Sequence, residues 1–188
     1  MIGKLLFVVA IVVWLTKENK AVNSRLKDNP DSEWDASSLQ SLLVGSTIAV
    51  VLGLALSFVT STAIFASEWP ALLLGALVLA AGAWVRVKAI RDLREQFTPN
   101  VVILADHKLH VDGIYQYVRH PGYSGALVCY LGMGLLLNNG LSLLAMALLL
   151  LPVYLYRINV EEKALTDTFG DQYVEYSRRT RRLIPNVY

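Results

Sequence analysis

Long apolar stretches alternate with polar segments along the chain. The apolar stretches cover residues 5–15, 39–66, 71–87, 126–137 and 141–156. A helix needs about 20 predominantly apolar residues to cross the hydrocarbon core of a membrane, which the second stretch exceeds and the first does not reach. We interpret the first as an uncleaved span, because no small-residue cleavage pattern follows it. The pattern predicts an all-α, polytopic transmembrane helical bundle of about five spans.

Residues that favour turns and helix starts mark the ends of these spans. Ser37 or Ser38 can cap the second helix, and Glu68-Trp69-Pro70 is predicted to form a short interfacial turn before the third. We expect a surface loop over residues 17–35. A tight turn at Asn138-Asn139-Gly140 would make the last two spans a C-terminal helical hairpin.

The third helix and the tail carry further structural signals. Gly75 and Gly82 lie on nearly the same helix face, which favours close contact with another helix. Polar residues extend this helix out of the membrane until Pro99-Asn100 ends it. The tail over residues 157–188 is amphipathic and charged, with a predicted helix stop at Phe169-Gly170.

The distribution of basic residues predicts the orientation of the chain. Lysine and arginine favour the cytoplasmic side of a membrane. The loop after the first span, the connector after the third span and the tail are basic, whereas residues 68–70 and 138–140 include no lysine or arginine. Five spans with the N-terminus outside and a cytoplasmic C-terminus satisfy every loop.

The composition supports an integral membrane protein. Of the 188 residues, 55% are hydrophobic and 17% are charged, and the mean hydropathy is +0.46, which does not fit a soluble globule. A net charge of +2 gives no indication of nucleic-acid binding. Cys129 is the only cysteine, which excludes a disulfide framework and a multi-cysteine metal site. We interpret His107 and His110 as solvated loop residues and predict no metal.

Two polar clusters bracket the predicted hairpin. The first is the segment Arg119-His120-Pro121-Gly122-Tyr123, and the second is Arg157 with Glu161-Glu162. An antiparallel hairpin returns to where it began, so we expect the clusters to be neighbours. Ionisable groups at the edge of a membrane bundle are costly unless they are paired or used. Each cluster alone also has a structural interpretation: Arg157 and Glu161 as an ordinary i, i+4 pair, and Arg119 as a headgroup anchor.

The order of the motifs resembles that of a known family. The motifs are Gly113-Ile114-Tyr115, Arg119-His120-Pro121-x-Tyr123-x-Gly125, Arg157 with Glu161-Glu162, Phe169-Gly170-x-x-Tyr173-x-x-Tyr176, and Pro185. Together they are similar to the isoprenylcysteine carboxyl methyltransferase and phospholipid methyltransferase superfamily of integral membrane methyltransferases. The similarity covers roughly the last ninety residues, and the combination is more specific than any one motif.

The resemblance implies S-adenosylmethionine as cofactor, bound at the cytoplasmic end of the last two spans. The residues that match the family's cofactor pocket are His120, Pro121, Tyr123, Glu161 and Glu162. We add Tyr115, which could stack on a ligand, and Arg119 of the same segment. The chain would be one domain over residues 1–188, with three spans in 1–95 and the cofactor-binding region in 96–188.

Methyl transfer from a sulfonium is an in-line displacement that depends mainly on positioning. A carboxylate acceptor needs no base, and Arg157 could hold it through its planar guanidinium. An amine or thiol acceptor would have to lose a proton, with Glu162 or His120 as the base. The sequence does not choose between them: a prenylated cysteine carboxylate is the family's best-known acceptor, but the short chain resembles prokaryotic members, and phospholipid amines or small thiols remain open.

Two other functions fit part of the pattern. A sterol-reductase-like membrane oxidoreductase carries a similar Arg-His-Pro-x-Tyr-x-Gly motif and would bind NADPH in the same region, but it generally has more spans. A non-catalytic membrane subunit or lipid carrier could use the same hairpin as a scaffold. Our main hypothesis is a multi-pass methyltransferase of a prokaryotic inner membrane, acting on a lipophilic or lipidated acceptor.

Overall fold

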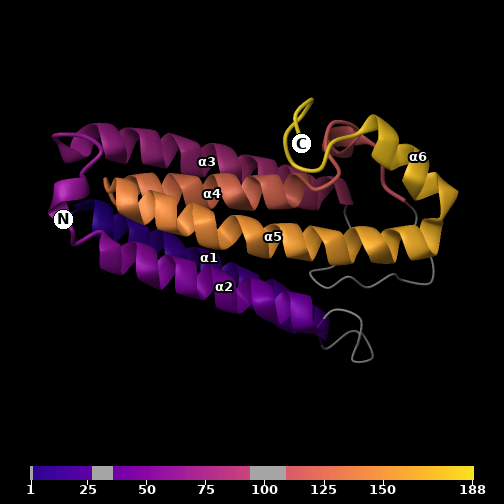
Figure 1. The fold of residues 1–188 in the computed structure, drawn as a ribbon, viewed down its shortest axis with the longest axis horizontal. Coiled ribbons are helices and arrows are strands. Elements are labelled where there is room, and N and C mark those ends of the chain that lie inside the picture. The colour runs from indigo at the N-terminus through magenta and orange to yellow at the C-terminus, as the bar shows by residue number, and fades with distance from the viewer. Residues whose placement is uncertain (1, 27–35, 94–108) are drawn as a thin grey trace.

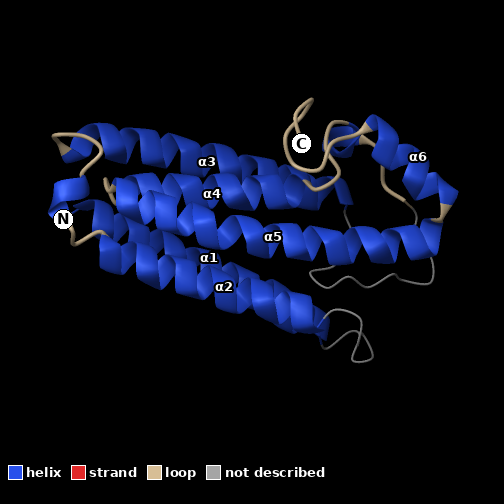
Figure 2. Cartoon of the chain, in the orientation of Figure 1, coloured by secondary structure: helices blue, strands red, loops and turns tan. Residues whose placement is uncertain are grey.

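The computed structural model describes residues 2–26, 36–93 and 109–188, and in these ranges it is helical and without named strands. The elements are α1 (Ile2–Leu26), α2 (Ala36–Leu56), η2 (Thr60–Thr62), α3 (Glu68–Leu93), η4 (Gly113–Gln116), α4 (Pro121–Leu136), α5 (Gly140–Phe169) and α6 (Asp171–Arg179). The all-α prediction is confirmed. Figure 2 shows that turns and short loops join these helices where the chain is described.

The five long helices lie side by side as one bundle, and α6 turns away at one end (Figure 1). The main contacts pair α3 with α4 and α2 with α5, while α4 and α5 form the predicted hairpin. The start of α4, the end of α5, α6 and the C-terminus all lie at the same end of the bundle (Figure 1).

Three of these helices are long and apolar enough to cross a membrane: Ser37–Leu56 of α2, α3, and α5. Large apolar side chains face outward along them, and Leu77 is 70% exposed and Leu148 66% exposed. An outer surface with so many exposed large apolar side chains fits contact with lipid rather than with water. The apolar part of α1, Ile2–Trp14, is shorter, and α4 has 16 residues. The chain is an integral membrane protein.

Glycine lets α3 and α4 approach to backbone contact. A Cβ atom at Gly82 would lie 2.6 Å from the amide nitrogen of Cys129 and 2.8 Å from the carbonyl oxygen of Gly125. A Cβ atom at Gly75 would lie 3.0 Å from the carbonyl oxygen of Gly132. Real Cβ atoms need more room than this, so the predicted close contact through Gly75 and Gly82 is confirmed.

Several predicted helix ends are wrong. The first helix continues to Leu26 instead of ending near residue 15, because the polar residues that follow include good helix formers; residues 27–35 of the predicted loop lie outside the described residues. The turn at residues 68–70 is the first turn of α3. The last apolar stretch and the first part of the tail form one continuous helix, α5, which runs to Phe169. The predicted end at Pro99-Asn100 also lies outside the described residues.

The second helix ends at Leu56 rather than near residue 66 because of a tertiary contact. The hairpin turn binds the segment that follows α2: Asn139 Nδ2 donates to the Val59 carbonyl at 2.8 Å, and Asn138 exchanges two hydrogen bonds with the backbone of Phe65, at 2.9 and 3.0 Å. These amides satisfy backbone groups that a longer helix would have paired internally.

Gly170 ends α5 as predicted, with φ +52° and ψ −127°. A side chain strains this backbone conformation. A Cβ atom at Gly170 would contact nothing within 4 Å, so Gly170→Ala tests backbone strain alone. We expect it to lower the free energy of unfolding by about 1–3 kcal/mol, measured by thermal denaturation in detergent. Gly122→Ala, where a Cβ is also free of contacts, is the control, and equal stability of the two variants would contradict the prediction.

Candidate active site at the end of the α4–α5 hairpin

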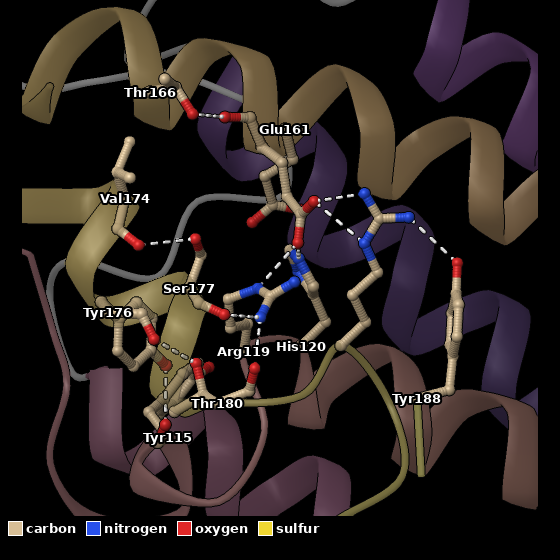
Figure 3. Close-up of polar contacts among 12 residues, drawn as sticks. Tyr115, Arg119, His120, Glu161, Thr166, Val174, Tyr176, Ser177, Thr180 and Tyr188 are labelled. Atoms are coloured by element: carbon tan, nitrogen blue, oxygen red, sulfur yellow. Dashed lines mark hydrogen bonds and ion pairs between the residues drawn. The ribbon is translucent and has the colours of Figure 1, made fainter. Parts of the chain in front are cut away.

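The two polar clusters predicted to be neighbours are in contact. His120 precedes α4 as its N-cap, and its Nε2 lies 3.2 Å from Oε1 of Glu162 on α5. In Figure 3 the side chains of Arg119 and His120 reach toward the helix that carries Glu161, and Tyr188 approaches from the C-terminal turn. The hairpin therefore brings the two clusters together, as the sequence predicted.

Glu162 is the centre of a charged network. Its Oε1 accepts from Arg119 Nε at 2.8 Å as well as from His120. Its Oε2 accepts from Nε and one terminal nitrogen of Arg182, at 3.0 and 2.6 Å. The Glu162 side chain is 13% exposed, so two guanidinium groups and an imidazole hold one mostly buried carboxylate.

Arg119 connects three elements through hydrogen bonds and is not a headgroup anchor. Its side chain is 10% exposed, and one terminal nitrogen donates to the carbonyls of Ser177 at 2.9 Å and Thr180 at 2.5 Å. With the bond to Glu162, this guanidinium joins the start of α4 to α5 and to the end of α6. The alternative of a solvated interfacial arginine does not fit these contacts.

Glu161 differs from its neighbour because part of its hydrogen-bonding capacity is unused. Its Oε2 is buried and has no hydrogen-bond partner among the described residues. The same oxygen lies 3.8 Å from Nδ1 of His120, whose ring stacks on that of Tyr123 with centroids 5.6 Å apart. A buried acceptor without a donor indicates room for a ligand that brings one.

Arg157 lies deeper in the bundle and is 1% exposed. Its Nε donates to the Tyr123 hydroxyl at 3.2 Å, and a terminal nitrogen donates to Ser38 Oγ at 2.6 Å. Ser38, which the sequence suggested only as a helix cap, is thus a site residue contributed by α2. The sequence offered no signal for this contact, since Ser38 and Arg157 are 119 positions apart.

Tyr115 packs inside the protein on the η4 side of the site. Its hydroxyl donates to the Ala89 carbonyl at 3.4 Å, and its own carbonyl accepts from Tyr176 at 2.6 Å. Burial, followed by the negative charge of Glu161, raises the pKa of the Tyr115 hydroxyl. The predicted stacking of Tyr115 on a ligand stays a prediction.

Arg182 is a further ionisable group at the site, and two histidines precede η4 in the chain. Burial lowers the pKa of Arg182, but hydrogen bonds with Tyr188 and Glu162 outweigh it, so that this pKa is raised. His110 contacts the ring of Tyr115 edge-on, with centroids 5.3 Å apart, and His107 lies outside the described residues. Among the described residues, no group of three or more His, Cys, Asp or Glu side chains could hold a metal ion.

The two polar clusters of the site lie within a region that matches a known family. The phospholipid methyltransferase family profile covers residues 70–172, more than half of the chain. The chain belongs to the phospholipid methyltransferase family. This confirms the superfamily that the motifs indicated, and it favours a membrane methyltransferase over a sterol-reductase-like oxidoreductase.

Relatives and a solved structure support the assignment to this family. Protein-S-isoprenylcysteine O-methyltransferase B of Arabidopsis thaliana is 32% identical over 156 residues, which are 80% of this chain and 79% of that protein. The corresponding methyltransferase of Schizosaccharomyces pombe is 38% identical over 111 residues, 58% of this chain and 47% of that protein. The structure of the eukaryotic intramembrane Ras methyltransferase ICMT (isoprenylcysteine carboxyl methyltransferase) superposes with a TM-score of 0.64 at 29% identity, covering 75% of this chain and 52% of that chain.

The share of each relative that is covered differs. This chain spans about four fifths of the plant protein and about half of the Schizosaccharomyces pombe protein and of the solved structure. These named relatives come from a plant and a fungus, so the prokaryotic host suggested by the short chain stays a prediction.

Proposed function

We propose that this protein transfers a methyl group from S-adenosylmethionine to the carboxylate of an isoprenylcysteine-like acceptor at the membrane surface. The supporting observation is the buried Oε2 of Glu161, which has no hydrogen-bond partner among the described residues and faces His120. Such an atom favours a ligand with a positively charged donor, in a site whose family transfers methyl groups.

The residues at the site fit the amino-acid portion of S-adenosylmethionine. Glu161 Oε2 and His120 Nδ1, 3.8 Å apart, can both accept from an ammonium group. The stacked ring of Tyr123 offers an aromatic face to a sulfonium. Pro121 begins α4 directly after His120 and holds the chain direction there. When bound, the cofactor supplies an electrophilic methyl group.

Arg157 suits the role of carboxylate holder. The hydroxyls of Tyr123 and Ser38 accept hydrogen bonds from its guanidinium and orient it. In a buried site with little water, such a cation attracts a carboxylate strongly and can bind both of its oxygens. Arg157 would thereby position the acceptor oxygen for in-line attack.

Glu162 is better suited to positioning than to taking a proton. Its two oxygens already accept from Arg119, His120 and Arg182, so protonation would break charge-assisted bonds. This arrangement favours a carboxylate acceptor, which needs no base, over an amine or thiol. Arg119 would support the cofactor indirectly, through the same carboxylate.

We also propose that all five long helices span the membrane, with the N-terminus outside and the C-terminus cytoplasmic. Helix α4 and the apolar part of α1, Ile2–Trp14, are shorter than the three candidate spans, but both helices lie alongside those spans (Figure 1). Arg91 lies in the last turn of α3, and Arg178 and Arg179 lie in the last turn of α6, so basic residues gather at the site end of the bundle, as expected for the cytoplasmic side. The contact between Ser38 and Arg157 supports a single domain.

A paired ligand titration tests the proposed function. We expect S-adenosylmethionine, and not NADPH, to raise the thermal stability of the purified protein in detergent, by about 2.7 kcal/mol at a hundredfold excess over Kd. His120→Ala and Glu161→Gln should abolish the effect, because the first removes an acceptor for the ammonium group and the second removes the negative charge that pairs with it. Glu175→Gln on the exposed face of α6 is the matched control.

The other outcomes decide between the alternatives. Stabilisation by NADPH alone would overturn the proposal in favour of an oxidoreductase. No response to either ligand, with lipid-dependent function intact in Arg157→Ala and Glu162→Ala, would favour a non-catalytic subunit.

A further inference from the structure

The segment that follows α6 returns to the site and pairs with the residues before α4. Val118 and Arg181 form a parallel bridge, in which the amides of Arg119 and His120 donate to the carbonyls of Arg181 and Arg182 at 2.7 and 3.0 Å. One turn into α4, Ser124 Oγ donates to the carbonyl of Leu183 at 2.6 Å. The tail is therefore fixed against the backbone that carries His120.

This pairing places the Arg182 side chain on Glu162 and Tyr188. Nε and a terminal nitrogen of Arg182 both donate to Oε2 of Glu162, at 3.0 and 2.6 Å. The other terminal nitrogen donates to the Tyr188 hydroxyl at 3.0 Å. Arg182 holds Oε2 of Glu162, whereas Arg119 and His120 share Oε1. The orientation of the carboxylate thus depends on Arg182.

The orientation of Glu162 in turn decides where His120 carries its proton. Oε1 of an ionised carboxylate can only accept, so the 3.2 Å contact requires a proton on Nε2. When the ring is neutral, Nδ1 is then an acceptor. Nδ1 faces Oε2 of Glu161 at 3.8 Å, and the two atoms together form the acceptor pair of the proposed ligand site.

We propose that Arg182 is a positioning residue: by holding Glu162, it keeps the His120 proton on Nε2 and leaves Nδ1 as an acceptor beside Glu161. The ligand class rests on the proposed function, but the effect on His120 does not. The tail thereby takes part in ligand binding without touching the ligand.

Nitrogen NMR of the imidazole rings tests the first step on the ligand-free protein. The chain has three histidines, and His120→Asn assigns the signal of interest. At about pH 9, above the ordinary pKa of histidine, we expect wild-type His120 to show one tautomer, protonated at Nε2. Arg182→Gln should show averaged signals from both tautomers, and Arg182→Lys should lie between them because lysine keeps the charge but lacks the planar fork.

Binding of S-adenosylmethionine by calorimetry tests the second step. We expect Arg182→Gln to weaken binding about tenfold, the effect of one lost charge-assisted hydrogen bond, and Tyr188→Phe to weaken it less. Arg181→Gln removes the same charge from the exposed neighbouring residue and should leave both readouts unchanged. Melting temperatures of all variants check that the fold persists.

The two experiments separate the failure of the positioning role from failure of the proposed function. If Arg182→Gln keeps the single His120 tautomer and wild-type affinity, or if Arg181→Gln weakens binding equally, the positioning role is overturned. If wild-type protein does not bind S-adenosylmethionine but Arg182→Gln still shows averaged signals from both His120 tautomers, the positioning role stands and the proposed ligand is wrong.

Discussion

Replacing Arg157 with alanine should lower kcat/KM for a lipophilic acceptor about a thousandfold while S-adenosylmethionine still binds. Arg157 is 1% exposed, and its hydroxyl partners on Tyr123 and Ser38 cannot replace its charge. Leaving a buried charge without its partner costs about 3–5 kcal/mol, and about 4 kcal/mol corresponds to a thousandfold in rate. The measurement is transfer of labelled methyl groups to a small S-farnesylated, N-acetylated cysteine.

The controls separate a loss of chemistry from a loss of structure. Arg91→Ala removes an exposed arginine at the same end of α3 and should retain wild-type activity. Thermal stabilisation of Arg157→Ala by S-adenosylmethionine should persist, because the acceptor pair at His120 and Glu161 is intact. An Arg157→Ala protein that binds S-adenosylmethionine and keeps activity within tenfold of wild type would refute the assignment of Arg157 to the acceptor carboxylate.

Gly82→Ala should destabilise the bundle by about 3 kcal/mol, the upper range for overpacking. The new Cβ would lie 2.6 and 2.8 Å from backbone atoms of Cys129 and Gly125. Backbone atoms cannot rotate away as a side chain can, so α3 and α4 would have to separate along their length. Thermal denaturation in detergent measures the loss.

Gly122→Ala is the matched control for this substitution. Gly122 lies in α4, the helix that Gly82 of α3 contacts, but a Cβ there meets nothing within 4 Å, so we expect a change of less than about 0.5 kcal/mol. Similar melting temperatures for Gly82→Ala and Gly122→Ala would mean that the two helices are not held at backbone contact.

Much of the fold follows from local sequence signals. Hydropathy located the apolar cores of the helices, and Asn138-Asn139-Gly140 and Gly170 marked turns whose backbone requirements depend on few neighbours; Asn138 has φ +49°. The end of α2 at Leu56 was not predictable, because it depends on hydrogen bonds from Asn138 and Asn139 to a segment more than 70 positions away. Local propensity carries no information on such contacts.

The candidate site, like the fold, was predictable only where local motifs and the hairpin determine it. An antiparallel hairpin must bring His120 near Glu162, and the 3.2 Å contact follows from that geometry. The roles of Arg182 and Ser38 did not follow, since one requires the chain to reverse after α6 and the other requires α2 to pack on α5. In the sequence, Arg182 is one of several basic residues in the tail, and nothing local distinguishes it from the others.

The hydrogen bond between Ser38 and Arg157 limits which N-terminal helices can replace those of this chain in a chimera. The family region begins at residue 70, yet a buried arginine inside it is oriented by a hydroxyl on α2. A chimera that joins residues 68–188 to foreign N-terminal helices would bury the guanidinium without that acceptor. The first two helices are therefore not interchangeable membrane anchors, and any replacement must bring a hydrogen-bond acceptor to the first turn of α2.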